Sequence, residues 1–368
     1  MTTPWGRSRL AAMRSAAACL SRATPRGRRL SWARLASPVR IFFFEVFAAG
    51  LIFTVGCNSS QPSLPVAAAP PTAAAQTNIS AAEAAPPAAQ TGGFDGAKAY
   101  DFTAKLVAFG PRPPASDAIH RTQDFIVSQL NGFGCAVDTD YFNAQTPIGT
   151  LAMKNIVAKV PGTGQGIILL LTHYDTLRLD NFVGAEDAGS SSGLMLEMAS
   201  LLCSGQKQPN AVWIAFLDGE EAQVVENGVA QWSATDSVYG SRELAARMAI
   251  SGDLKKIKAV ILADMVGQKG RHILRESDST KWLKDLVWKT AARLGYNDVF
   301  LNGEAQAADD HGPFLRRGVP AVDVIDLQDY INEGYWHTPA DTMDKISPRS
   351  LAIVGHVILE SINELQKR

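Results

Sequence analysis

The sequence predicts an α/β fold, a single-domain three-layer αβα sandwich with a mostly parallel central sheet. Three observations support this class. Segments with apolar residues at helical spacing alternate with short runs rich in Val, Ile and Leu. Ile167–Thr172 is a continuous run of leucine and β-branched residues, as expected for a central strand covered on both faces. Ala211–Leu217 is a second apolar run, and it stops abruptly at Asp218-Gly219-Glu220-Glu221.

The remaining elements follow from the same patterns. Strands are expected at Cys135–Phe142, Asn155–Val160, Ile167–Thr172, Ala211–Leu217, Ala259–Ala263 and Pro320–Ile325. Helices are expected at Ala97–Phe109, Ala118–Leu130, Leu194–Cys203, Ser241–Ile250, Lys281–Leu294 and Leu351–Leu365. Glycine and proline residues at 110–114 separate the first two helices. The folded body is therefore expected to span residues 96–368.

The first 57 residues differ from the body in charge. They contain nine of the 35 Lys and Arg residues but only one of the 36 Asp and Glu residues. The rest of the chain keeps 26 basic and 35 acidic residues, a formal charge of −9. Such a body lacks the clustered Lys and Arg that phosphate contacts need, so no nucleic-acid partner is expected.

The arginine-rich start is followed by a short apolar stretch, Ile41–Gly56. It is shorter than the roughly 20 residues of a comfortable bilayer span, and a basic region before a short apolar core is typical of a secretory signal. It ends at Thr54-Val55-Gly56-Cys57, which resembles a bacterial lipobox with Cys57 as the lipidated residue. An uncut anchor helix is the alternative, and Arg28-Arg29 is only a weak sign of twin-arginine export. We expect an exported bacterial lipoprotein, periplasmic or cell-envelope, held at a membrane by its N-terminal lipid or anchor.

Residues 58–95 are expected to form a disordered linker. They consist mostly of Ala, Pro, Ser, Thr and Gln. They lack the large apolar side chains whose burial would offset the entropy lost on ordering.

The body contains two cysteines, Cys135 and Cys203. An exported protein permits a disulfide between them, but two distant cysteines do not require one. No CxxC pair or Cys/His cluster indicates a thiolate metal site.

Polar side chains of the metal-ligand type lie at the ends of three predicted strands and in two of the loops that follow predicted strands. They are His173, Asp187, Glu221, Asp264 and His337. In open α/β sheets, ligands bind just beyond the carboxyl ends of the strands, so these side chains are expected at one edge. His and carboxylate ligands suit Zn²⁺, and buried carboxylates without a cation would repel one another.

Each of these residues alone also fits a role without function. His173 fits a hydrogen-bonded core histidine, Asp187 a helix cap, and the Glu220-Glu221 pair a solvated acidic turn. Five such coincidences at one sheet edge are improbable together. Adjacent residues leaving a strand point in different directions, so Glu221 can hold a metal while Glu220 stays free to move a proton.

With these motifs the body resembles the zinc-dependent M28 aminopeptidases and, more closely, the glutaminyl-peptide cyclotransferases (glutaminyl cyclases). The shared motifs are His173-Tyr174-Asp175, Gly184 to Asp187, Gly219-Glu220-Glu221 and Trp336-His337-Thr338. The stretches that favour the cyclases are Gln145-Thr146-Pro147, Trp232 to Arg242, and Asp309 to Pro320. The departures from animal cyclases are a longer segment between Glu221 and Trp232, Ala308 in place of Gln, Asp323 in place of His, and missing half-cystines around His173-Tyr174-Asp175.

The resemblance implies a zinc site and a proton carrier. As in the cyclases, one zinc would be held by Asp187, Glu221 and His337. Glu220 would act as the general acid and base.

The resemblance also implies the surroundings of that site. Asp264 and Asp309 would form a hydrogen-bonded carboxylate network beside the proton carrier, and Trp232 and Trp336 would wall the substrate pocket. In the aminopeptidases, the residues matching His173 and Asp264 hold a second zinc, with the aspartate of the first site bridging both ions. One zinc or two therefore both stay open.

Three functions follow. A glutaminyl cyclase would convert the N-terminal Gln of a peptide or protein to pyroglutamate with release of ammonia, with zinc polarising the γ-amide and Glu220 moving the proton. A di-zinc aminopeptidase would use Glu220 to activate water against the first peptide bond. A non-catalytic peptide-binding lipoprotein is the third, and the presence of Glu220 disfavours it because a binder needs no proton carrier.

Overall fold

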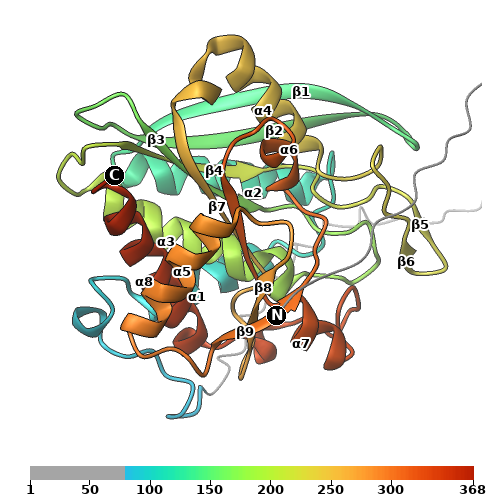
Figure 1. Ribbon diagram of the computed structural model, residues 1–368. Coiled ribbons are helices and arrows are strands. Elements are labelled where there is room, and N and C mark those ends of the chain that lie inside the picture. The colour runs from blue at the N-terminus through green and yellow to red at the C-terminus, as the bar shows by residue number, and fades with distance from the viewer. Residues whose placement is uncertain (1–78) are drawn as a thin grey trace, which may run out of the picture. The chain divides into compact units, whose positions relative to one another are not determined.

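The computed structural model describes residues 79–368 (Figure 1). The expected signal with Cys57 and most of the expected linker lie outside the described residues. The helices are α1 (Gly96–Val107), α2 (Asp117–Gly132), α3 (Ser191–Cys203), α4 (Tyr239–Ser251), α5 (Lys281–Arg293), α6 (Gly312–Leu315), α7 (Leu327–Asn332) and α8 (Pro348–Leu365). Within residues 79–368, no helix combines the length and apolar character needed to cross a membrane.

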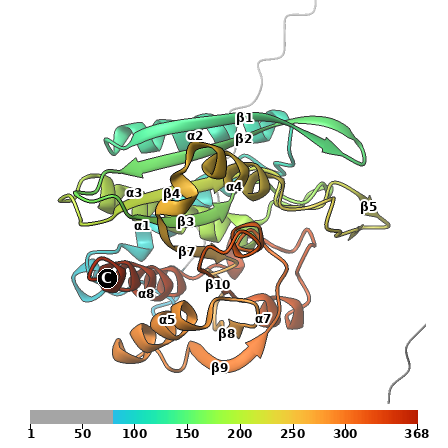
Figure 2. The ribbon, with the colours of Figure 1, turned by 45° about the horizontal axis from the view of Figure 1, so that its top comes forward.

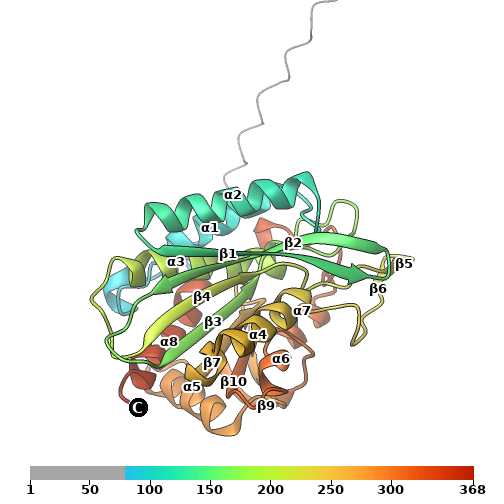
Figure 3. The same ribbon diagram turned by 90° about the horizontal axis from the view of Figure 1, so that it is seen from above.

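The central sheet has six strands in the order β1-β2-β4-β3-β7-β10. These are β1 (Ala136–Thr146), β2 (Gly149–Val160), β3 (Ile167–His173), β4 (Ala211–Leu217), β7 (Ile257–Asp264) and β10 (Ala321–Ile325). Strands β4, β3, β7 and β10 are parallel, whereas β1 and β2 form an antiparallel pair at one edge (Figure 3). The mostly parallel α/β sheet predicted from the sequence is confirmed.

Helices cover both faces of the sheet (Figure 2). Helices α1, α2, α3, α5 and α8 contribute to the core on one face, and α4 and α6 to the core on the other. Strand β3 is buried at every position. Its side chains alternate between the two cores, with Leu170 in the first and Leu169 and Leu171 in the second. Burial on both faces explains why the first five residues of this strand, Ile167–Leu171, are all apolar.

The hairpin of β1 and β2 is longer than predicted. Its register runs from Ala136 opposite Lys159 to Thr146 opposite Gly149. The predicted strands stop at Phe142 and begin at Asn155, because the outer half of the hairpin is largely exposed and mixes polar with apolar residues irregularly. Its sequence therefore lacks the alternation that marks a half-buried strand.

The boundary of the predicted linker is corrected by the structure. Ala88–Gln90 forms a 3₁₀ turn, and Phe94 is fully buried in the core against Gly355 of α8. Thr91 donates a hydrogen bond to the carbonyl oxygen of Phe94 at 2.6 Å. Phe94 is a single aromatic residue in a stretch of mostly small and polar residues, so the composition of residues 58–95 did not indicate it. The packed body therefore begins before residue 96.

Cys135 and Cys203 form a disulfide that closes a 68-residue separation. It joins the residue before β1 to the last residue of α3. The sequence left open whether the two cysteines pair, and the structure shows that they do.

Several short elements were not predicted. They are β5 (Val225–Glu226), β6 (Val229–Ala230), β8 (Ile273–Glu276), β9 (Phe300–Ala305), and helices α6 and α7. All have six residues or fewer, which is too short for apolar periodicity to identify.

Candidate metal centre and active site

The carboxyl ends of the parallel strands bring the candidate residues together. His173 is the last residue of β3, and Asp264 is the last residue of β7. Glu220 and Glu221 follow the end of β4, which lies beside β3. All four side chains are buried, as the expected position at the sheet edge requires.

Asp187, Glu221 and His337 form the first of two ligand clusters. The Nε2 atom of His337 lies 3.2 Å from Asp187 Oδ2 and 3.4 Å from Glu221 Oε1. Ligand atoms around a tetrahedral zinc at about 2.0–2.1 Å are separated by about 3.3 Å. The three side chains predicted to share an ion therefore lie at the spacing that such an ion needs.

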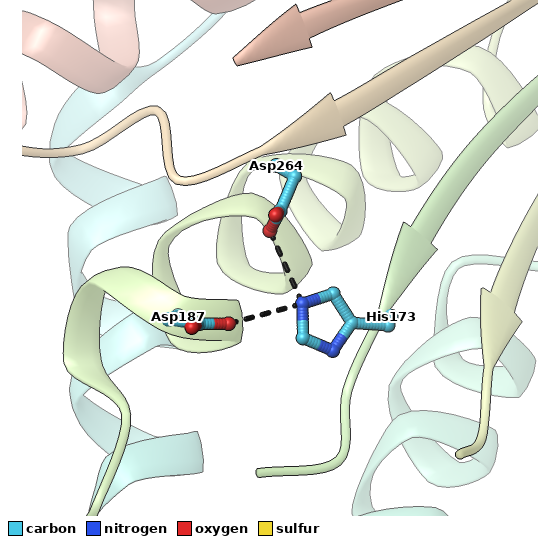
Figure 4. A group of neighbouring side chains, drawn as sticks. All are labelled: His173, Asp187 and Asp264. Atoms are coloured by element: carbon cyan, nitrogen blue, oxygen red, sulfur yellow. Dashed lines mark hydrogen bonds and ion pairs between the residues drawn. The ribbon is translucent and has the colours of Figure 1, made fainter. Parts of the chain in front are cut away.

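His173, Asp187 and Asp264 form the second cluster (Figure 4). The Nε2 atom of His173 lies 3.2 Å from Asp187 Oδ1 and 3.1 Å from Asp264 Oδ1. Asp187 thus presents one carboxylate oxygen to each cluster. The arrangement has the geometry of two adjacent ion sites joined by a bridging carboxylate.

The donor atoms of the first cluster fit a divalent cation. Both carboxylate oxygens of Glu221 are buried without a hydrogen-bond partner among the described residues. A buried carboxylate in that state is costly unless a cation or proton compensates it. One imidazole and two carboxylates are a donor set that suits Zn²⁺.

Protonated histidines compensate these carboxylates when no cation is present. Burial lowers the pKa of His337, but Glu221 and Asp187 outweigh it and raise the value to about 10. Burial alone would raise the pKa of Asp187, yet the hydrogen bonds from His173 and His337 hold it below its usual range. A metal ion would replace these protons, so its binding releases protons and weakens as the pH falls.

Asp175 orients the glutamate pair. Its carboxylate accepts hydrogen bonds from the backbone N–H groups of Glu220 at 3.1 Å and Glu221 at 3.4 Å. Gly219 precedes the pair with a φ of 72°, and a Cβ there would meet Met153 Sδ at 2.5 Å. The turn after β4 therefore needs glycine. The hydrogen bonds to Asp175, the third residue of the His173-Tyr174-Asp175 motif, hold this turn in place.

Two residues that the sequence did not indicate hold the loop of Asp187. Asp341 accepts hydrogen bonds from the backbone N–H groups of Glu186 at 2.8 Å and Asp187 at 3.2 Å. The fully buried Arg112 donates to the carbonyl oxygens of Tyr174 at 2.8 Å and Gly184 at 3.0 Å. Arg112 lies in the proline-rich stretch at 110–114, where the sequence predicts only a helix break, and its isolated charge there is the one local signal.

Glu220 lies beside the clusters in an acidic surrounding. Its Oε2 atom is 3.9 Å from His173 Nδ1. Burial raises the pKa of Glu220 well above its usual range, opposed by His173 and assisted by Asp309. Burial and the charge of Asp264 raise the pKa of Asp309 to about 7. Asp309 thus perturbs Glu220 through its charge, and Asp264 perturbs Asp309 in the same way.

Asp323 extends this acidic group where the animal cyclases often have His. It is fully buried, and its Oδ2 atom lies 3.7 Å from Nδ1 of His311. The other ring nitrogen of His311 lies 3.3 Å from Glu276 Oε2. The imidazole of His311, from a neighbouring segment, therefore lies beside the position of Asp323.

A cavity of about 300 Å³ opens onto the clusters. Trp232 and Trp336 both line it, as expected, together with Glu220, Glu221 and His337. The long segment between Glu221 and Trp232 forms the β5–β6 hairpin, and Ala230 at its end also lines the cavity. The extra length therefore leaves Trp232 in place.

Three non-glycine residues around the candidate site have left-handed backbone conformations. They are Val238, Met265 and His337, with φ values of 46°, 47° and 51°. Such conformations are strained for residues other than glycine, and strain of this kind gathers at functional sites. The N–H of Val238 donates to the carbonyl oxygen of Glu220 at 2.8 Å, which ties one strained residue to the glutamate pair.

Comparisons with known proteins agree with this geometry. Residues 155–362 match peptidase family M28. The glutaminyl-peptide cyclotransferase-like protein of Mus musculus is 31% identical over 277 residues, which cover 67% of this chain and 70% of that protein.

Solved structures show the same similarity. The glutaminyl cyclase of an Acidobacteriales bacterium aligns with a TM-score of 0.69 and 38% identity, covering 81% of this chain and 99% of that chain. A Zn-dependent exopeptidase from Parabacteroides distasonis aligns with a TM-score of 0.67 and 26% identity, covering 75% and 99%.

The fold and the clustered ligands define the class, an α/β protein of the exopeptidase type with its site at the carboxyl edge of a mostly parallel sheet. The chain belongs to peptidase family M28, and within it to the glutaminyl-peptide cyclotransferases.

Proposed function

We propose that this protein is a zinc-dependent glutaminyl-peptide cyclotransferase, which converts the N-terminal Gln of a peptide or protein to pyroglutamate and releases ammonia. One observation carries the proposal. Glu220 is buried outside the ligand cluster, yet next to it, in a cavity walled by two tryptophans. The similarity to glutaminyl cyclases selects this reaction among those that such a site supports.

Asp187, Glu221 and His337 are the residues that would hold the ion. When bound there, zinc supplies a Lewis acid for the γ-amide carbonyl of the substrate. Trp232 and Trp336 enclose the glutamine side chain and limit the access of water. The cavity of about 300 Å³ suits one residue, so the rest of the peptide lies outside it.

Glu220 moves the proton. Its carboxylate takes a proton from the substrate α-amine, whose nitrogen attacks the γ-amide carbon of the same residue. The new C–N bond closes the five-membered ring, and the bond to the amide nitrogen breaks. Glu220 returns the proton to the departing ammonia, so the enzyme ends unchanged. The raised pKa of Glu220 suits this exchange near neutral pH. Confinement of amine and amide within one residue supplies the proximity.

The second cluster favours a second candidate, an M28-type aminopeptidase with two metal ions. His173 and Asp264 have the spacing to hold another ion, with Asp187 between the two. The same Glu220 would then activate water against the first peptide bond.

Product analysis separates the two candidates. The zinc-loaded protein is incubated with a peptide that has an N-terminal Gln, and the masses of the products are measured by mass spectrometry. Cyclisation gives a mass loss equal to one ammonia with the peptide intact. Release of free glutamine would instead establish hydrolysis and overturn the proposed function. The Glu220→Gln variant and the protein stripped by a chelator serve as controls, and neither should form product.

A further inference from the structure

A second cavity adjoins the candidate active site. It measures about 870 Å³ and shares Trp232, Ala307, Ala308 and Asp309 with the smaller cavity that holds Glu220. Its other walls come from five residues between positions 233 and 242, from Asp278 and from the segment of α6. A peptide whose first residue occupies the smaller cavity therefore has a neighbouring space for its next residues.

Two arginines line this second cavity without a carboxylate partner. Arg247, Arg275 and Arg293 each form an ion pair elsewhere on the protein. Within residues 79–368, by contrast, no carboxylate oxygen lies within 4.0 Å of Arg242 or Arg316. Both guanidinium groups therefore remain available to a ligand.

Arg242 is held in a fixed orientation. Its Nη1 atom donates to the carbonyl oxygen of Ala234 at 3.2 Å, and its guanidinium lies 4.5 Å from the centre of the Tyr239 ring. These contacts occupy part of the guanidinium group, which has five N–H donors, and leave other donors free. Arg316 is exposed at the end of α6. Asp278 and Asp309 are the carboxylates among the lining residues, and Asp278 accepts a hydrogen bond from Gln306 Nε2 at 3.4 Å.

The two cavities thus differ in charge. The smaller one is lined by five carboxylates, those of Asp187, Glu220, Glu221, Asp264 and Asp309. That surrounding suits the N-terminal amine of a peptide. The larger one balances the carboxylates of Asp278 and Asp309 with two guanidinium groups, and guanidinium groups bind carboxylates with paired, charge-assisted hydrogen bonds. In an extended peptide, residues two and three follow the first by about 3.5 and 7 Å.

We infer that the cavity between Trp232 and Arg316 is a subsite for the residues after the N-terminal Gln, and that Arg242 and Arg316 select peptides with Asp or Glu at the second or third position. This inference rests on the proposed function and names its substrate class. The preference should appear mainly in KM, because the arginines bind the substrate equally before and during the reaction.

Peptides of one length with amidated C-termini test the inference. They begin Gln-Glu-Ala, Gln-Ala-Glu, Gln-Ala-Ala or Gln-Lys-Ala, and ammonia release by the zinc-loaded protein gives kcat/KM for each. We expect at least one of the Glu peptides to exceed the alanine peptide by about 3- to 10-fold and the Lys peptide to fall below it. Added salt should reduce both differences, because it screens exposed charges.

Arginine variants test whether Arg242 and Arg316 cause the preference for acidic peptides. Arg316→Gln should reduce the ratio of acidic to neutral peptide, Arg316→Lys should retain part of it, and the double variant with Arg242→Gln should bring it to about one. Arg317→Gln is the matched control. Arg317 is the next residue and exposed, but it donates to the carbonyl oxygen of Pro313 and does not line the cavity. It should keep the wild-type ratio.

The outcomes are distinguishable. Equal kcat/KM for all four peptides overturns the inference and leaves the cyclase activity established. A preference that survives both arginine substitutions overturns the assignment to this cavity. Absence of ammonia release from every peptide overturns the proposed function itself.

Discussion

Two adjacent glutamates after β4 lie in different environments. Glu221 points to His337, at 3.4 Å, and both of its oxygens are buried without a hydrogen-bond partner within residues 79–368. Glu220 lies outside the three-residue cluster, near His173 and the carboxylate of Asp309. Asp175 holds both backbone N–H groups, so the turn determines which side chain faces which group. The division of roles between neighbours is therefore a property of the turn.

Glu220→Gln tests that division. The amide keeps the shape of the side chain but accepts no proton, so we expect kcat to fall by about 10²- to 10⁴-fold or more. Metal content measured on the purified variant should equal that of the wild type. Glu226→Gln is a control at the exposed β5–β6 hairpin and should change neither quantity. Loss of zinc from Glu220→Gln would show that this residue is a ligand instead.

Asp309→Asn tests the electrostatic control of Glu220. Glu220 accepts a proton only when ionised, so activity should fall as the pH drops through its pKa. The charge of Asp309 raises that pKa. Its removal should therefore shift the acid limb of the kcat/KM profile to lower pH, by about one unit or less. A limb that stays in place, or moves upward, would contradict this role of Asp309.

The five ligand-type residues were predictable because each follows a strong apolar strand or lies in a distinctive motif. The residues that hold them were not. Asp341 caps the Asp187 loop from a position 154 residues away, and Arg112 reaches the same loop from before α2. Such contacts depend on how distant segments meet, which no local spacing pattern encodes.

At the scale of elements, burial decided what the sequence could predict. Strands β3 and β4 are covered on both faces and appear as apolar runs with sharp ends. The outer half of the β1–β2 hairpin is largely exposed, and β8 and β9 are short, so neither has a distinctive pattern. The elements that carry the candidate site were therefore predicted better than those around it.

The Cys135–Cys203 disulfide stabilises the edge of this sheet. It covalently closes a chain segment with a sequence separation of 68, which runs from β1 to α3. A variant with both cysteines replaced by alanine should therefore lose about 2–5 kcal/mol of unfolding free energy. Urea unfolding measures the loss, and wild-type protein treated with a thiol reductant is the matched comparison. Activity at low temperature should be unchanged, since neither cysteine lines the two cavities. Equal stability of variant and wild type would contradict the role.

At the scale of the whole molecule, the folded body and the arginine-rich head, residues 1–57, have different expected roles. Residues 79–368 contain the sheet, both ligand clusters and the cavities. The arginine-rich head lies outside the described residues, and its role stays a prediction. We propose that it exports the protein and that lipid attached at Cys57 anchors the body to a bacterial envelope membrane.

Cys57→Ser tests the anchor. The full chain and the variant are expressed in a bacterial host and separated into membrane and soluble fractions. The wild type should sediment with membranes and incorporate labelled lipid, whereas the variant should incorporate none. Cys19→Ser is the matched control and should behave as the wild type. Lipid incorporation that persists in the Cys57 variant would contradict the proposed anchor.

Anomalous diffraction at the zinc edge, from crystals of the zinc-loaded protein, tests the central claim most directly. We predict a peak about 2.0–2.2 Å from ligand atoms of Asp187, Glu221 and His337, with the Glu220 carboxylate outside the coordination shell. A second peak between His173 and Asp264 would add an ion and favour the aminopeptidase candidate. No peak among the first three residues, or a peak ligated by Glu220, would contradict the account.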